Sequence, residues 1–113
     1  MMNHKELEKS KIHVTSQIVG YLSNSVLSRT IIEKITGNIS AISFDDGEGL
    51  PEKTSPFDTF IQIIEGKAEI IIDGIPYFLE EGECITIPAH QSNAIKGNKR
   101  FKMILTLIKS GYE

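Results

Sequence analysis

Turn-forming residues recur along most of this chain at intervals of roughly eight to ten residues, and this spacing limits the fold more than any other feature. The turns are marked by Gly37-Asn38, Gly47-Glu48-Gly49, Ser55-Pro56, Gly66, Asp73-Gly74, Gly82 and Gly97-Asn98. Short runs rich in isoleucine, valine, phenylalanine and threonine lie between them. Many short strands at such spacing are typical of an all-β sandwich or barrel.

The length and composition predict a single domain over residues 1–113. With 113 residues, 40% hydrophobic and 24% charged, the chain resembles ordinary globular proteins and has no room for a second domain. Residues 1–11 form a polar N-terminal segment, either a short helix or a frayed tail. The net charge of -3 argues against nucleic acid as a partner, because a nucleic-acid groove needs a basic surface. The short basic run at residues 96–102 (Lys96, Lys99, Arg100 and Lys102) is more typical of a solvated turn than of an RNA-binding patch.

Cysteine usage and hydropathy argue against disulfides, secretion and membrane insertion. The chain has one cysteine, Cys84, so an intrachain disulfide is excluded and a small apolar side chain packed in or on a strand is expected. Uninterrupted apolar stretches such as residues 70–72 are far shorter than a secretory or membrane-spanning segment. We therefore expect a cytoplasmic protein without membrane contact.

Two local segments are open to prediction in more detail. Asp73-Gly74 lies between two apolar runs and accepts the positive φ angles of a type I′ hairpin turn. Pro76 cannot donate to a strand ladder, so we expect it at a sheet edge or a bulge.

Residues 26–35 show helical spacing at Leu27, Ile31 and Ile35, but their many β-branched side chains favour a strand.

The last predicted strand, residues 101–109, carries apolar side chains on both of its faces. Phe101, Met103, Leu105 and Leu107 alternate with Lys102, Ile104, Thr106 and Ile108. A strand of this kind is expected to be covered on both sides, and burial in a homodimer is one way to achieve this.

The turn residues also follow two longer patterns. Gly47, Lys53, Ser55, Thr59 and Gly66 form the first, and Gly82, Pro88, His90, Asn93 and Gly97 form the second. Their spacing resembles the two motifs of the cupin superfamily, and the resemblance covers roughly residues 37–109. It implies a double-stranded β-helix, a small jelly-roll barrel of two antiparallel sheets.

The resemblance also implies a metal site inside the barrel, held by three histidines and a glutamate. In this sequence those four positions carry Lys53, Ser55, Thr59 and Asn93. A lysine ammonium and three neutral oxygen or amide groups are poor ligands for a divalent transition metal. We therefore predict no metal and no cofactor at this position.

Other residues offer little replacement for the lost ligands. Asp58 lies one position before the expected glutamate, and a one-residue step along a strand points to the opposite face. His90 stands where the family often has glycine, and His4 and His13 lie outside both motifs. A metal site built from other residues would need the side chains of His90 and Asp58 to lie close together.

If the motif positions point inward, as the resemblance implies, the barrel has an apolar pocket with a polar rim. Lys53, Ser55, Thr59 and Asn93 form the rim. The expected wall is Ile61, Ile63, Ile85, Ile87, Ile95, Met103 and Leu105. Such a pocket suits a small, partly apolar molecule with a carboxylate or carbonyl group for Lys53. The alternative is an interior filled by aromatic side chains, namely Phe44, Phe57, Phe60, Tyr77 or Phe78.

Three functions remain open from the sequence. The first is a metal-free binding or sensing module, acting as a homodimer. The second is a metal-independent, isomerase- or lyase-like enzyme that uses Lys53 as acid, base or imine former. The third is a structural dimer with a vestigial pocket. Fold alone cannot choose among them, because one scaffold carries many chemistries.

Overall fold

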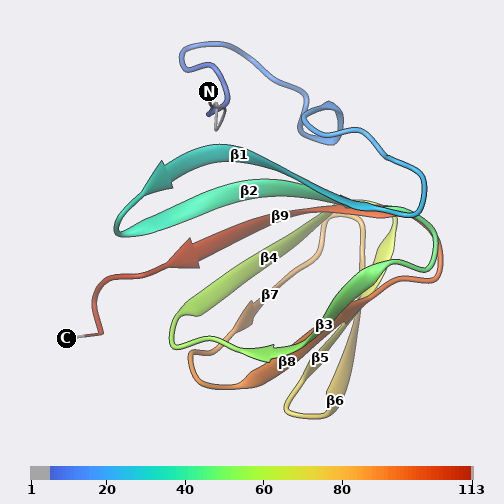
Figure 1. The fold of residues 1–113 in the computed structure, drawn as a ribbon, viewed down its shortest axis with the longest axis vertical. Coiled ribbons are helices and arrows are strands. Elements are labelled where there is room, and N and C mark those ends of the chain that lie inside the picture. The colour runs from blue at the N-terminus through green and yellow to red at the C-terminus, as the bar shows by residue number, and fades with distance from the viewer. Residues whose placement is uncertain (1–5, 113) are drawn as a thin grey trace.

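The computed structural model describes residues 6–112, which form nine strands in two facing antiparallel sheets (Figure 1). In chain order these are β1 (Val26–Lys34), β2 (Gly37–Phe44), β3 (Gly49–Thr54), β4 (Asp58–Glu65), β5 (Lys67–Ile72), β6 (Ile75–Glu80), β7 (Cys84–Ile87), β8 (Ser92–Lys96) and β9 (Phe101–Ile108). Within the described residues the helical structure is one 3-10 turn, η1 (Thr15–Gln17), and no helix there is long and apolar enough to cross a bilayer.

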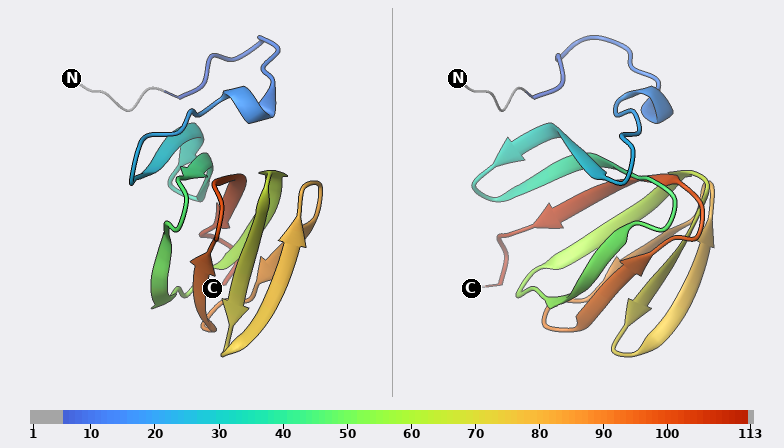
Figure 2. Two further views of the ribbon diagram at one scale, coloured as in Figure 1. Left: turned by 90° about the vertical axis from the view of Figure 1, so that its right-hand side faces the viewer. Right: turned by 45° about the vertical axis from the view of Figure 1, so that its right-hand side comes forward.

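The two sheets form the jelly-roll barrel that the motif spacing implied. One sheet has the strand order β1-β2-β9-β4-β7 and the other the order β3-β8-β5-β6. Every neighbouring pair of strands is antiparallel, and the chain crosses repeatedly from one sheet to the other (Figure 2). The predicted all-β, double-stranded β-helix is confirmed.

Residues 26–34 form a strand, as their β-branched content predicted. β1 pairs with β2 along its length, with a bulge between Thr30 and Ile32. β1 is an edge strand of its sheet, and the half-buried side chains on it alternate with exposed ones only in part. The helical spacing of Leu27 and Ile31 is compatible with this strand because residues four apart also share one face of a strand, and both pack against the same apolar cluster.

The hairpin at Asp73-Gly74 is also confirmed. Asp73 has φ +50° and Gly74 has φ +79°, the left-handed pair that a type I′ turn requires. β6, which follows the turn, is the edge strand of the second sheet. Pro76 therefore lies on a sheet edge, where its missing N–H costs no ladder bond.

The inner faces of the two sheets form one apolar core. It contains Ile42, Phe44, Ile61, Ile63, Ala68, Ile70, Ile72, Leu79, Ile87, Ile95, Phe101 and Met103. The rings of Phe44 and Phe101 stack in parallel with their centroids 4.3 Å apart, and both side chains are fully buried. The register pairs these two residues at the end of β2 and the start of β9. The stack therefore fills the end of the barrel from which β9 starts.

The N-terminal segment covers part of the opposite, outer face of the five-stranded sheet (Figure 1). Leu7, Ile18 and Val19 bury Ala41 of β2 and Ile104 of β9 in a second apolar cluster. Residues 6–11 are therefore neither a helix nor a frayed tail, and residues 1–5 lie outside the described residues. Much of the outer apolar face of β9 is thus covered within one chain.

A polar network holds this segment to the sheet around Tyr21. The Tyr21 hydroxyl donates to a Glu65 carboxylate oxygen at 2.6 Å, and the Arg100 guanidinium lies 4.4 Å from the Tyr21 ring centroid. Burial and the neighbouring Glu65 raise the pKa of the Tyr21 phenol. The Lys102 ammonium donates to the Ser16 carbonyl at 2.5 Å, so a lysine on an otherwise apolar face is satisfied.

The stacked phenylalanines predict a large difference between two aromatic truncations. Phe44→Ala should lower the free energy of unfolding by about 3–5 kcal/mol, because it leaves a cavity in a fully buried position. Phe78→Ala should lower it by less than about 0.5 kcal/mol, because Phe78 is 74% exposed. Urea unfolding of both variants and of the natural chain measures the two losses in the free energy of unfolding. Equal losses would contradict a core centred on Phe44.

Candidate functional site

Three of the four motif positions lie at the end of the barrel opposite the Phe44–Phe101 stack. Lys53 of β3 pairs with Asn93 of β8, and Asn93 pairs on its other side with Ile72 of β5. Thr59 of β4 lies in the other sheet, between Ile87 of β7 and Leu107 of β9. Because strand register sets these pairs, the two sheets bring both motifs to one mouth of the barrel.

The four side chains have different environments at this mouth. Thr59 is 8% exposed and Asn93 is 4% exposed, so both are buried polar residues. The Asn93 amide nitrogen donates to the Lys53 carbonyl at 3.4 Å, while the Lys53 side chain is exposed. The Ser55 hydroxyl accepts the Phe57 N–H at 3.2 Å, and the Ser55 carbonyl accepts the His90 N–H at 2.7 Å. Ser55 therefore organises the loops that lead into and out of the mouth.

This group of side chains does not fit a transition-metal ion. The Ser55 hydroxyl and the Asn93 amide already make bonds to the main chain, and Lys53 adds a positive charge to the site. Within residues 6–112 no three histidine, cysteine, aspartate or glutamate side chains gather in an arrangement that holds a metal. The chemistry of the mouth is therefore that of hydrogen bonding and one cation.

Asp58 and His90 have structural roles in the same loops. The Asp58 carboxylate accepts the Ala89 N–H at 2.8 Å, which ties the loop after β7 to the start of β4. His90 has φ +69°, in the left-handed region, and its side chain is exposed. This backbone conformation explains why glycine suits the position in the family motif.

All seven predicted wall residues lie in or against the inner core. Ile61, Ile63, Ile87, Ile95 and Met103 are almost fully buried, whereas Ile85 and Leu105 are partly buried and pack on them. The sequence missed two further partly buried residues of this face, Val26 and Leu50. Leu50 pairs with Ile95 and points inward, although simple alternation from Lys53 would place it outside. A register shift between Leu50 and Lys53 reverses the alternation.

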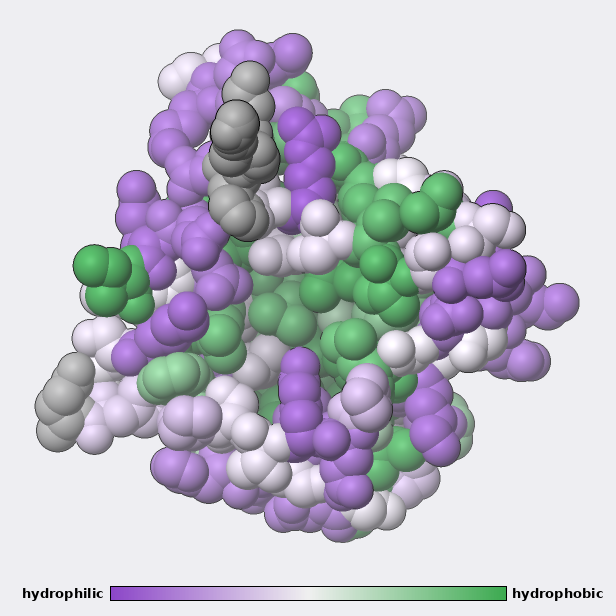
Figure 3. Space-filling model, in the orientation of Figure 1, coloured by the Kyte–Doolittle hydropathy of each residue, from purple (hydrophilic) through white to green (hydrophobic). Residues whose placement is uncertain are grey.

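Hydrophobic side chains gather in a hollow in the middle of one face of the molecule, with hydrophilic side chains around them (Figure 3). Of the aromatic residues that were alternatives for filling the barrel, Phe44 lies in the core at the closed end. Tyr77 and Phe78 are 40% and 74% exposed on the edge strand β6, and so are not part of the filling. Phe57 and Phe60 are half-buried outside the inner core, and the Phe57 ring packs on Tyr112 with centroids 5.9 Å apart. Of the five alternatives, Phe44 alone belongs to the inner core.

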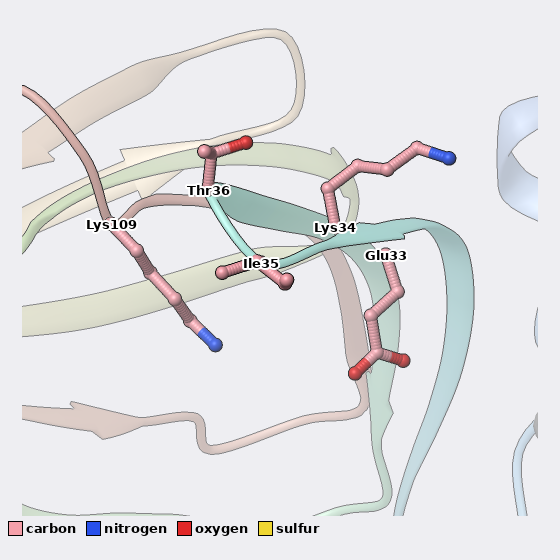
Figure 4. Close-up of a pocket in the computed structure, with 5 residues that line it drawn as sticks. All are labelled: Glu33, Lys34, Ile35, Thr36 and Lys109. Carbon is pink, nitrogen blue, oxygen red and sulfur yellow. The ribbon is translucent and has the colours of Figure 1, made fainter.

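A second hollow lies at the β1–β2 turn, beside the end of β9 (Figure 4). Its lining residues are Glu33, Lys34, Ile35, Thr36 and Lys109. Figure 4 shows the Lys34 and Lys109 side chains diverging, with Ile35 between them. The two ammonium groups do not converge on one point, so this hollow does not form a two-lysine anion site.

No family model and no curated protein matches the chain, but solved structures do. A conserved Streptococcus pyogenes protein of unknown function is 31% identical, with a TM-score of 0.89 over 98% of this chain and 97% of that one. A cupin superfamily protein from Desulfitobacterium hafniense is 30% identical, with a TM-score of 0.85 over 96% of this chain and all of that one. A cupin 2 conserved barrel domain protein from Leptotrichia buccalis is 27% identical, with a TM-score of 0.80, over 83% of this chain and 46% of its own length.

The donor set at the mouth predicts a low metal content. Elemental mass spectrometry of the purified protein, after incubation with nickel, zinc, iron or manganese, should find below about 0.1 metal ion per chain. As a positive control, the combined variant Lys53→His, Ser55→His, Thr59→Glu and Asn93→His restores the family's ligands and should take up metal. Near-stoichiometric metal in the natural chain would overturn this interpretation of the site.

Proposed function

The chain belongs to the cupin superfamily, and from this we propose that it is a metal-free module that binds or senses a small molecule at its barrel mouth. The observation that carries the proposal is the arrangement of Lys53, Thr59 and Asn93. The strand register places these three polar residues at one end of an apolar interior, and stacked rings fill the other end. Small-molecule sites in proteins are built in this way, from an apolar wall and a few placed polar groups.

The chemistry of the mouth favours an anionic or carbonyl-bearing ligand with an apolar body. In this proposal Lys53 supplies a cation on the rim, and the buried Thr59 hydroxyl and the side-chain carbonyl oxygen of Asn93, whose amide nitrogen already donates to the Lys53 carbonyl, supply hydrogen bonds inside it. Ile85, Leu105 and other partly buried apolar residues offer surface that a ligand would remove from water. The ligand class is therefore a small carboxylic or keto acid with an aliphatic or aromatic portion.

A binding role is better supported than catalysis by Lys53. A lysine that acts as nucleophile is desolvated or lies beside another cation. The Lys53 side chain is exposed, and it forms no ion pair within residues 6–112. Neither activating feature is found there, so the metal-independent enzyme remains the weaker of the two proposals.

A screen of small carboxylic and keto acids tests the proposed ligand site. We expect a ligand to raise the melting temperature and to shift the NMR signals of Thr59, Asn93 and Leu105. The change Lys53→Gln should weaken its binding about fivefold to tenfold, because it removes a charge-assisted hydrogen bond. The matched change Lys99→Gln, near the other end of the barrel, should leave binding within about twofold.

Two results would count against the site. The first is ligand-induced shifts confined to residues outside the inner core. The second is an equal loss of affinity in the two lysine variants. A complete failure of a broad panel, together with slow hydrogen exchange throughout the inner core, would favour a vestigial pocket.

The same proposal includes a homodimer. Ile32, Ile35 and Ile108 are 37%, 96% and 47% exposed, and they lie around the β1–β2 turn and the adjacent end of β9. The Lys109 N–H donates to the Thr36 carbonyl at 2.8 Å, which holds these two segments together. Exposed apolar side chains at neighbouring positions are typical of a surface that is buried on association.

Sedimentation velocity measures the proposed dimer directly. The natural chain should sediment as a dimer, and Ile35→Glu should shift it to a monomer, because a buried carboxylate opposes association. Ile75→Glu, at a 56% exposed position in the other sheet, is the matched control and should remain dimeric. A monomeric natural chain at about 100 μM would exclude the dimer.

A further inference from the structure

A groove on the outside of the four-stranded sheet lies at the end of the barrel opposite the proposed ligand site. It has a volume of about 730 Å³ and is lined by the start of β5, the end of β6 and the β8–β9 loop. Its floor includes Phe78, which is 74% exposed, and Gly66 and Gly97 mark the end of the barrel to which it belongs. The proposed ligand site does not use any of these residues.

The groove is positively charged in a chain that is negative overall. Four cations and two carboxylates line it, namely Lys67, Lys96, Lys99 and Arg100 with Glu69 and Glu80, whereas the whole chain has a net charge of -3. Arg100 is paired with Asp45 at 2.9 Å. Within residues 6–112, Lys67, Lys96 and Lys99 form no ion pair. In the register Glu69 lies between Phe78 and Lys96, and Glu80 lies opposite Lys67, so the three ammonium groups line the groove beyond these two carboxylates.

The loop that carries two of these cations is held in place by hydrogen bonds. The Arg100 N–H donates to an Asp46 carboxylate oxygen at 2.7 Å, and the Gly47 N–H donates to the Asn98 carbonyl at 3.2 Å. Lys99 lies between Asn98 and Arg100 in the sequence. A positioned loop of this kind lowers the entropy that binding would cost.

The edge of β6 beside the groove is largely closed to pairing with another strand. Ile72 and Ile75 flank the two-residue turn and form a hydrogen-bonded pair, and such pairs alternate along an antiparallel ladder. The N–H and C=O groups of every second residue of β6, namely Pro76, Phe78 and Glu80, therefore point away from β5. Pro76 has no N–H, and the Glu80 N–H already donates to a Glu83 carboxylate oxygen at 2.8 Å. One main-chain donor, that of Phe78, remains for a partner, so side chains must supply most of the contact.

We propose that this groove binds an acidic peptide segment of a partner protein, with an apolar side chain of the segment on Phe78 and its carboxylates on Lys67, Lys96 and Lys99. Charge complementarity carries the proposal, because three lysines without an ion pair line a groove whose exposed apolar side chain a partner would bury. Glu69 and Glu80 lie between the cations, so the groove suits carboxylates spaced along a peptide better than the continuous phosphate charge of a nucleic acid. An open groove on a sheet surface suits an extended segment of chain.

An NMR titration of the full chain tests the proposal with a defined probe, an eight-residue peptide of six glutamates around a central Leu-Phe pair. It should saturate with shifts at Phe78, Lys96 and Lys99, and a glutamine version should bind about tenfold more weakly. The double variant Lys96→Glu, Lys99→Glu should lose about tenfold in affinity or more, and Phe78→Ser about threefold.

A second double variant separates this site from general attraction to a basic surface. Lys9→Glu with Lys11→Glu makes the same change in net charge at exposed positions outside both the groove and the proposed dimer surface, and should leave affinity within about twofold. Equal losses in the two double variants would overturn the proposal, as would the absence of shifts at about 2 mM peptide. Tighter binding of an oligouridylate octamer than of the peptide would also overturn it, in favour of a nucleic-acid site. Melting curves of all variants exclude unfolding as the cause of a loss.

Discussion

The parallel stack of Phe44 on Phe101 is the contact on which the rest of the structure depends. It joins the end of β2 to the start of β9 and closes one end of the space between the two sheets. With that end filled, the polar residues of the interior lie at the other, where Thr59 and Asn93 are buried on facing sheets. The aromatic pair thus packs one end of the barrel tightly, and the buried polar side chains lie at the other end.

The second apolar cluster explains why β9 is hydrophobic on both faces. β9 lies in the middle of its sheet, with the core on one side and the N-terminal segment on the other. Leu7 and Ile18 cover Ile104, and Tyr21 and Ser16 receive Lys102, whose side chain is 6% exposed. The segment before the barrel is therefore part of the folded unit, and any subunit contact would use the remaining apolar surface beside it.

The two ends of the barrel carry different chemistry on one scaffold. At the mouth, the four positions that match the spacing of the family's metal ligands carry Lys53, Ser55, Thr59 and Asn93. The basic groove near Gly66 and Gly97 is built from strand ends and one pinned loop. The mouth and the groove both use side chains outside the apolar core. The residues of either site can therefore change without loss of the fold.

Local chemistry in the sequence determined the strands, the Asp73-Gly74 turn, the placement of Pro76 at an edge or a bulge and the shared strand face of Ile61 and Ile63, since these follow from backbone preference and a period of two. The resemblance to the cupin motifs supplied the inward direction of that face. The sequence also shows that the four motif positions carry none of the three histidines and the glutamate that bind metal in the family. Only the tertiary structure decided the position of Leu50, where a bulge reverses the alternation, and the burial of Leu7 and Lys102. These depend on contacts between residues far apart in the chain, which no local pattern encodes.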